Sequence, residues 1–218
     1  MRVNVIGNGP QAGLFDPETP GLNVVCNMPP IDLPKDKVYG SCMVDFKMMN
    51  ALKEGLVDLD KYDWILGTRP RVWMEKNPTF YMKYAQNIKG FHTYIPKYAQ
   101  LPGQKLSEAA TNYSCGHMAV DYACRIMSAK EVHMYGFDAL FEMDITSYTD
   151  NFLTSDRTPL NTHRLSSNWR PIWRFIFAEF NNVKFYIHHE HENIKIPIKT
   201  MDNVEVIVES GEANEEIL

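Results

Sequence analysis

Short apolar segments recur along the chain, separated by stretches that are rich in glycine, proline and polar residues. In the first segment Val3, Val5 and Ile6 surround the polar Asn4, and short apolar runs bounded by turn residues are typical of buried strands. We therefore predict strands at residues 3–6, 22–26, 42–45, 64–66, 91–95, 132–135 and 183–187.

Two segments in the second half of the chain, 118–127 and 169–180, carry apolar residues at helical spacing. Pro171 is tolerated only in a first helical turn, so the second helix is expected to begin near residue 169. From residue 91 onward the order is strand, helix, strand, helix, strand, which implies parallel strands joined by crossover helices. The expected fold class is α/β, with a doubly wound, mostly parallel, Rossmann-like sheet.

The length and composition are compatible with one domain. With 218 residues, of which 44% are apolar, the chain can bury a full core, and we assign residues 1–208 to a single α/β domain. Residues 68–107 are aromatic and interrupted by prolines, and we expect them to form a lid or small insertion. Residues 209–218 carry four glutamates and no base, which predicts an acidic, disordered tail.

Several classes of protein are excluded at this point. No apolar run approaches the roughly 18 residues that span a membrane, and the first residues lack the features of a signal peptide. The four cysteines form no C-x-x-C pair, which predicts reduced thiols in the cytoplasm. Because no other ligand motif completes the His188-His189-Glu190-His191 cluster, we interpret it as an exposed strand end and expect no metal.

The turn after the first strand is a candidate nucleotide site. Gly7 and Gly9 let a backbone approach a phosphate or ribose, and the Asn8 amide offers both a donor and an acceptor. Nucleotides bind at the carboxyl ends of such strands. The glycine spacing of residues 7–13 departs from the dinucleotide fingerprint, and Pro10 removes one N–H. We therefore expect a nucleotide other than NAD, with a tight structural turn as the alternative.

Positive charge is concentrated in two stretches of this acidic chain. Residues 67–107 contain seven bases against one acid, interleaved with aromatic rings, and residues 157–174 contain four arginines and no acid. Such stretches can bind a polyanion, or the rings can be core and the arginines can hold one nucleotide diphosphate. The candidate phosphate or acceptor contacts are Arg69, Arg71, Trp73, Arg157 and Arg164.

Three further positions carry groups that can take part in binding or catalysis. Ser114, Cys115 and Gly116 precede the helix at 118–127, so the helix N-terminus favours an anion there; a catalytic Cys115 is weighed against a packed small residue. Asp138 follows the strand at 132–135 and either caps a turn or contacts substrate. His163 lies before the predicted last helix, where it is either a proton acceptor or a surface histidine.

The order and spacing of these motifs resemble the bacterial sialyltransferases of glycosyltransferase family 42, over roughly residues 3–190 but poorly across 50–105. The matching elements are Ile6-Gly7-Asn8-Gly9-Pro10, Cys26-Asn27, the turn at 114–116, the segment 131–138 and His163. The resemblance implies a variant GT-A fold with a lid and an inverting, metal-independent reaction. It also implies a nucleotide-sugar co-substrate and no other cofactor.

Residue roles follow from the resemblance only where positions match. Asn8 and Asn27 would contact the nucleotide, Ser114 and Gly116 would lie beside the donor sugar, and His163 would be the general base. The family has Thr-Ser-Gly where this chain has a cysteine at 115, and an arginine where this chain has Asn112. We therefore expect a pyrimidine nucleotide sugar other than a sialic acid donor.

Two tyrosines steady the departing phosphate in the family. Here Leu140 replaces the first of them and Tyr148 can match the second, while Arg157 or Arg164 can supply the missing phosphate contact. Anionic lipid would repel the acidic tail, which argues against a membrane glycolipid as the acceptor.

The basic aromatic stretches favour a polyanionic acceptor. The concrete hypothesis is a phage-type enzyme, active in the host cytoplasm, that transfers a sugar such as arabinose to a hydroxymethylated pyrimidine in DNA. The alternatives are a sialyltransferase that acts on a glycan and a non-catalytic module that binds nucleotide or nucleic acid.

Overall fold

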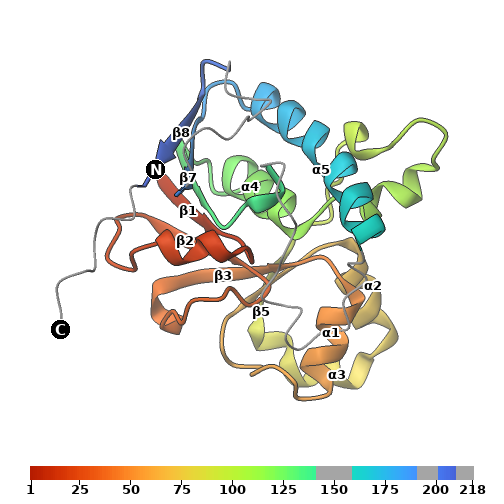
Figure 1. Ribbon diagram of the computed structural model, residues 1–218. Helices are drawn as coiled ribbons and strands as arrows, with labels where there is room; N and C mark the ends of the chain where they lie inside the picture. The colour runs from red at the N-terminus through yellow and green to blue at the C-terminus, as the bar shows by residue number, and fades with distance from the viewer. Residues whose placement is uncertain (141–158, 191–200, 210–218) are drawn as a thin grey trace.

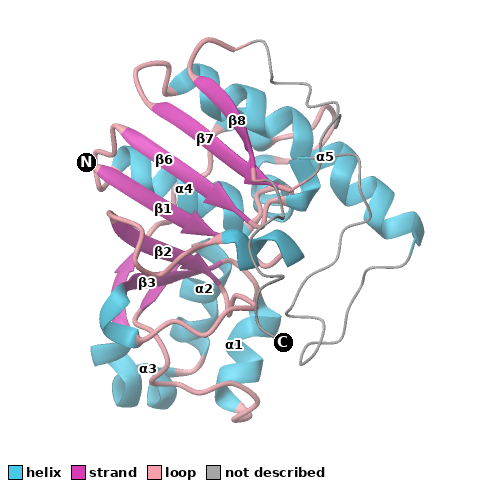
Figure 2. Cartoon of the chain, turned by 60° about the vertical axis from the view of Figure 1, so that its left-hand side comes forward, coloured by secondary structure: helices cyan, strands magenta, loops and turns pink. Residues whose placement is uncertain are grey.

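The protein is built around one 8-stranded sheet (Figure 2) in the order β5-β4-β3-β2-β1-β6-β7-β8. The structure, a computed structural model, describes residues 1–140, 159–190 and 201–209. Every neighbouring pair of strands in the described sheet is parallel. The strands are β1 (Arg2–Ile6), β2 (Leu22–Cys26), β3 (Val38–Met43), β4 (Trp64–Leu66), β5 (Ile88–Phe91), β6 (Glu131–Tyr135), β7 (Lys184–His189) and β8 (Val204–Val208).

Helices cover both faces of the sheet, as in a doubly wound fold (Figure 1). One face packs on α4 (Cys115–Arg125) and α5 (Pro159–Glu179). The other face packs on the short 3₁₀ helix η1 (Pro10–Leu14), α1 (Phe46–Lys53), α2 (Thr68–Lys76) and α3 (Pro78–Tyr84). The expected Rossmann-like α/β class is confirmed, and the sheet is parallel throughout its described part.

The alternation in β1 explains why this strand lies in the middle of the sheet. Val3 and Val5 join the core on the α4 side, whereas Ile6 joins the core on the α1 side. Asn4 is also fully buried, and its amide nitrogen donates to Asn23 Oδ1 on β2 at 2.8 Å. Because successive side chains of a strand point to opposite faces, both faces of β1 must be covered.

Strands at 22–26 and 64–66 have the predicted bounds, and those at 3–6 and 132–135 each begin one residue earlier. β3 and β5 lie further toward the N-terminus than predicted, and β7 begins one residue later and ends two residues later than predicted. β8 and the helices α1, α2 and α3 were not predicted. Each of these elements is short, and packing against the sheet decides the conformation of such segments.

Residues 68–107, expected to form a lid or insertion, include the crossover from β4 to β5. Within this segment α2 and α3 pack on the sheet, and β5 pairs with β4 as the edge strand. About half of the segment is therefore sheet framework. A lid role for the remainder, which runs from His92 over the ends of the strands, stays a prediction.

The start of α5 differs from the expectation. The helix begins at Pro159, which puts Pro171 in its interior instead of its first turn. Proline suits a first helical position because its fixed φ is already helical and its missing N–H has no partner to lose there. The sequence-based start was wrong because a buried face around Ile172, Ile176 and Phe177 holds the helix in place despite Pro171.

Candidate functional site

The order of the strands reverses beside β1, and this point defines the candidate site. From β1 the chain proceeds outward through β2 to β5, and it then returns to place β6 on the other side of β1. Ligands of doubly wound proteins bind outside the carboxyl ends of the strands at such a switch point. The turn at 7–9 follows β1 and the turn at 136–138 follows β6, so the structure brings these two predicted motifs together.

The two turns interlock through their glycines. Gly7 N donates to Tyr135 O at 2.7 Å, and Gly9 N donates to Gly136 O at 3.1 Å. A Cβ atom at Gly7 would overlap Gly136 O, and one at Gly9 would overlap the carboxylate of Asp138. The glycines therefore allow the close approach of two protein turns, and their N–H groups are already hydrogen-bonded to the end of β6 and the turn after it. Asn8 is the residue of this turn whose side chain is placed to meet a ligand.

Asn8 and Asn27 converge on one atom at the N-terminus of α4. The amide nitrogens of Asn8 and Asn27 lie 3.8 Å and 3.6 Å, respectively, from Cys115 Sγ. Their carbonyl oxygens, Asn8 Oδ1 and Asn27 Oδ1, are buried without a hydrogen-bond partner among the described residues. An unsatisfied buried acceptor costs about 1–3 kcal/mol, so each oxygen is a candidate for contact with a ligand.

The backbone of Asn27 is held in an uncommon conformation. Its φ of 50° lies in the left-handed region, which non-glycine residues seldom adopt. Asn27 N donates to Cys42 O at 3.0 Å, and Ser41 Oγ donates to Asn27 O at 2.6 Å. These two bonds from β3 hold the strained residue and direct its side chain toward α4. Such strain often accompanies functional sites.

Ser114 and His117 fix the N-terminus of α4. Ser114 Oγ accepts a hydrogen bond from His117 N, while His117 Nδ1 accepts one from Ser114 N at 3.0 Å. His117 Nε2 lies 3.2 Å from Trp169 O on α5 and donates to it. Burial lowers the pKa of His117 to about 3, partly opposed by the bond to this carbonyl group. His117 is therefore neutral, which leaves Nδ1 free to accept.

Cys115 is the only one of the four cysteines that is not buried. A hydrogen bond to Cys115 and burial raise the pKa of Cys26 well above its usual value, and burial likewise raises the pKa of Cys42. The contacts between Cys115 Sγ and the two asparagine amides supply no group that can accept a proton. This arrangement favours a positioning role for Cys115 over a nucleophilic one.

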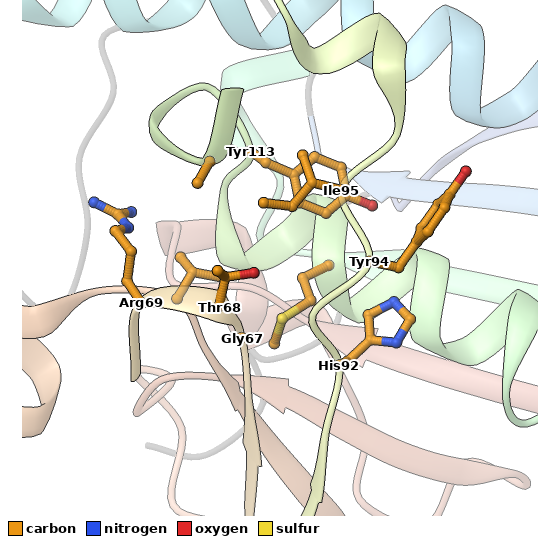
Figure 3. Close-up of a pocket in the computed structure, with 10 residues that line it drawn as sticks. Gly67, Thr68, Arg69, His92, Tyr94, Ile95 and Tyr113 are labelled. Atoms are coloured by element: carbon orange, nitrogen blue, oxygen red, sulfur yellow. The ribbon is translucent and has the colours of Figure 1, made fainter. Parts of the chain in front are cut away.

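A hollow continues the site along the same edge of the sheet, beyond the ends of β3, β4 and β5. Its volume is about 250 Å³, including space open to solvent. Figure 3 shows Arg69 and His92 at opposite ends of this pocket, with Tyr113 between them on its far wall. Residues of its lining include Val44, Gly67, Thr68, Arg69, His92 and Tyr113.

Two basic residues of the 67–107 stretch are already paired. Arg69 Nη2 contacts Asp45 Oδ1 at 2.5 Å, and Arg71 forms an exposed ion pair with Glu75. Trp73 is 7% exposed and packs in the core on the α1 side. This location agrees with the alternative that the rings of this stretch are core, and it leaves Trp73 no surface for an acceptor.

Four predicted residues cannot be placed as side chains. Tyr148 and Arg157 lie outside the described residues. His163 and Arg164 lie within α5, so the expectation that His163 belongs to a loop is corrected, and only their backbone is described. Their chemical roles stay predictions.

His92 is the site residue that the sequence reasoning missed. It follows β5 directly, as Asn8 and Asn27 follow β1 and β2 at short distance. A polar residue just after each predicted strand was the available signal, but the predicted strand at 91–95 enclosed this position. The end of β5 became visible only from its pairing with β4.

Comparison of the chain with protein-family models, with curated proteins and with solved structures finds no match. Within the described ranges, no cluster of three or more His, Cys, Asp or Glu side chains is suited to hold a metal ion. No helix in those ranges is long and apolar enough to cross a membrane.

Proposed function

We propose that the protein is an inverting, metal-independent glycosyltransferase whose nucleotide-sugar donor binds over the switch point between β1 and β6. The observation that carries this proposal is the convergence of Asn8 and Asn27 on Cys115 at the start of α4. These residues are distant in sequence and belong to three of the five motifs on which the resemblance to family 42 rests. Their contact supports one common binding site for them.

The donor contacts follow from the unsatisfied atoms. Asn8 Oδ1 and Asn27 Oδ1 are acceptors without a described partner, and base amino groups and ribose hydroxyls are donors that suit them. The N-terminus of α4, which includes Gly116, favours the negative charge of the donor phosphate. A pyrimidine base is our first choice because the resemblance implies one.

The environment of Asn112 supports a donor sugar without a carboxylate. The family has an arginine at this position, but Asn112 is 3% exposed and its amide nitrogen donates to Ala99 O and Gln104 Oε1. It holds the loop before α4 and offers no charge to a ligand. Leu140 likewise is buried where the family has a tyrosine. A variant GT-A fold with a lid remains a part of the proposal that rests on the resemblance, which also implies His163 as the base; the donor site does not depend on which residue is the base.

The acceptor is less supported than the donor site. The basic, aromatic stretch predicts a DNA acceptor, but three of its residues support this less than expected. Trp73 is buried in the core, and Arg69 and Arg71 form ion pairs with acidic side chains. Tyr81 and Lys83 on α3 are exposed. DNA with a hydroxymethylated pyrimidine therefore stays a prediction for the acceptor.

Thermal shift followed by turnover tests the proposal. We expect CMP, UMP or UDP to raise the melting temperature more than AMP, ADP or GDP, with about 2.7 kcal/mol of stabilisation at 100 times the dissociation constant. A panel of nucleotide sugars should then release free nucleotide. Binding without release from any sugar would support a non-catalytic module, and the absence of any nucleotide-dependent shift would contradict the site.

A further inference from the structure

A second constellation of polar groups lies beside the pocket and has no part in the donor site. His92 follows β5, and its Nε2 lies 2.7 Å from Asp121 Oδ1 on α4. The two side chains are 4% and 0% exposed. His92 N also donates to Leu66 O at 2.9 Å, so both the backbone and the ring of this residue are held in place.

The contacts of Asp121 determine which nitrogen of His92 carries the proton. Arg125 Nε donates to Asp121 Oδ1 at 3.2 Å, and Arg125 Nη2 donates to Oδ2 at 2.9 Å. A carboxylate in such a bidentate pair only accepts hydrogen bonds. His92 Nε2 must therefore be the donor, so that in the neutral imidazole the lone pair lies on His92 Nδ1.

Arg125 is itself anchored on the far side of Asp121. It pairs with Glu179 at 2.6 Å and lies over the ring of Tyr94, 4.3 Å from the ring centroid. The dyad is thus fixed by α4, by α5 and by the loop after β5. A histidine that is oriented by a buried carboxylate and retains a lone pair is the arrangement of a general base.

His92 lines the pocket, and none of the described residues forms a hydrogen bond with its Nδ1 atom. The enclosed space of the pocket is about 10 Å³, enough for about one water-sized group, and the wider hollow of about 250 Å³ includes space open to solvent. A hydroxyl group therefore fits beside His92, and the ring that carries it would lie toward the open side. Tyr94 and Tyr113 contribute aromatic surface. Arg69 is the only Lys, Arg, Asp or Glu side chain of this lining, and it pairs with Asp45. The lining therefore suits an uncharged ring that carries a hydroxyl group.

The pocket continues the donor site. Met118, one helical turn after Cys115, lines it, as does Tyr113, which precedes Ser114. Neighbouring strands are about 4.8 Å apart, so the end of β5 lies about 14 Å from the end of β2 along this edge. A nucleotide sugar is an extended molecule, and one that binds Asn8 and Asn27 through its nucleotide can direct its sugar toward this pocket.

We propose that this pocket is the acceptor subsite and that His92, positioned by Asp121, is the general base of the transfer; the proposal rests on the proposed function. The acceptor oxygen attacks the anomeric carbon of the donor, and the bond from that carbon to the phosphate oxygen breaks. Its electron pair leaves on the nucleotide phosphate. The acceptor proton moves to His92 Nδ1, and the resulting imidazolium ion is paired with Asp121 before it releases the proton to solvent.

Hydrolysis with water as acceptor tests this role with the full-length protein and the nucleotide sugar that gives most turnover in the panel above. His92→Ala should lower nucleotide release about 10²–10⁴-fold, the usual contribution of a positioned base, and change donor affinity less than twofold. Imidazole added to the buffer should restore part of the lost rate, because the truncated side chain opens onto the pocket. His133→Gln is the matched control, since it removes another buried histidine far from this pocket, and it should leave the rate within a few-fold.

Asp121→Asn tests the positioning residue. Its kcat should fall while KM for the donor stays the same, and ¹⁵N NMR of the histidine rings should show that His92 is no longer held in the form protonated at Nε2. Retention of that form with full activity would overturn the role of Asp121. Melting curves of both variants, measured alongside, identify any variant that does not fold. If Asp121→Asn does not fold, imidazole rescue of His92→Ala decides whether His92 is the base.

Transfer to methyl β-D-galactopyranoside and to an oligonucleotide with 5-hydroxymethylcytosine separates two sources of a hydroxyl-bearing ring. Whichever is glycosylated, the reaction should require His92. Turnover that survives His92→Ala but is lost in His163→Gln would overturn the proposal in favour of the base that the resemblance implies. If wild-type protein binds nucleotide but turns over no nucleotide sugar, the proposed function fails, and the role of His92 as its base fails with it.

Discussion

The amide nitrogen of Asn27 lies 3.6 Å from the thiol of Cys115, although 88 residues separate them in the chain. Asn27 directly follows β2, whereas Cys115 begins α4, so the parallel sheet and its crossover bring them together. With Asn8 Nδ2 3.8 Å from the same sulfur atom, three motifs meet at one point. The following expectations test this site and the scaffold around it.

Removing the Asn27 amide should weaken nucleotide binding without disturbing the backbone, if glycine replaces it. Asn27→Gly tolerates the φ of 50° and should lower the affinity for the best-binding nucleotide by about 0.5–1.5 kcal/mol, measured by calorimetry. Asn27→Ala loses the same amide but also strains the backbone, and it should lower the melting temperature as well. Equal nucleotide affinity in wild type and Asn27→Gly would rule out a role for the side chain.

Gly9→Ala should destabilise the protein because the new methyl group overlaps the carboxylate of Asp138 and comes within 2.8 Å of Gly136 O. The expected loss in the free energy of unfolding is about 1–3 kcal/mol, measured by urea titration. Gly13→Ala is the matched control, since a Cβ atom there has no neighbour within 4 Å. Equal unfolding midpoints for the two variants would show that the turns after β1 and β6 do not interlock.

The buried His117 should make the protein acid-sensitive. Burial lowers the pKa of His117 to about 3, whereas the unfolded chain takes up this proton near pH 6.5. Below that pH the unfolded state binds a proton that the native state excludes, so the free energy of unfolding should fall by about 1.4 kcal/mol per pH unit until about pH 3. His117→Gln should be less stable at pH 7 yet lose less stability between pH 6.5 and pH 4.

Other buried histidines also make the stability of the protein depend on pH. Burial also lowers the pKa of His133, to about 4, and lowers the pKa of His188, and both groups contribute equally to wild type and variant. The difference between their unfolding curves, recorded by circular dichroism, isolates His117. Parallel stability curves over the whole range would mean that His117 titrates in the native state as it does in the unfolded chain.

Trp73→Ala should reveal whether this ring serves the core or the surface. The ring is 7% exposed, and its indole nitrogen donates to Asn50 Oδ1 at 2.8 Å. Truncation should lower the free energy of unfolding by about 3–5 kcal/mol. Tyr81→Ala, which alters a ring that is 36% exposed, should change it by less than about 1 kcal/mol. A stable Trp73→Ala variant with weakened binding to DNA would show that this ring contacts the acceptor and does not serve the core.

The sequence by itself determined the α/β class, because strands buried on both faces of a parallel sheet are short, apolar and bounded by turns. The strands at 22–26 and 64–66 needed nothing else. Local pattern also indicated Asn8, in the turn after the first strand, and the turn at 114–116, which precedes a helix, as candidate sites. Asn27 was added only by the resemblance to family 42.

Only the tertiary structure decided the remaining features, because they depend on contacts between distant segments. β8 is a strand because Phe185 to His189 of β7 pair with it, and the glycines of the first turn are needed because the turn after β6 packs against them. His92 gained its partner only when α4 placed the fully buried Asp121 beside the end of β5. No local periodicity encodes such a contact, which arises where the crossover helix packs on the sheet.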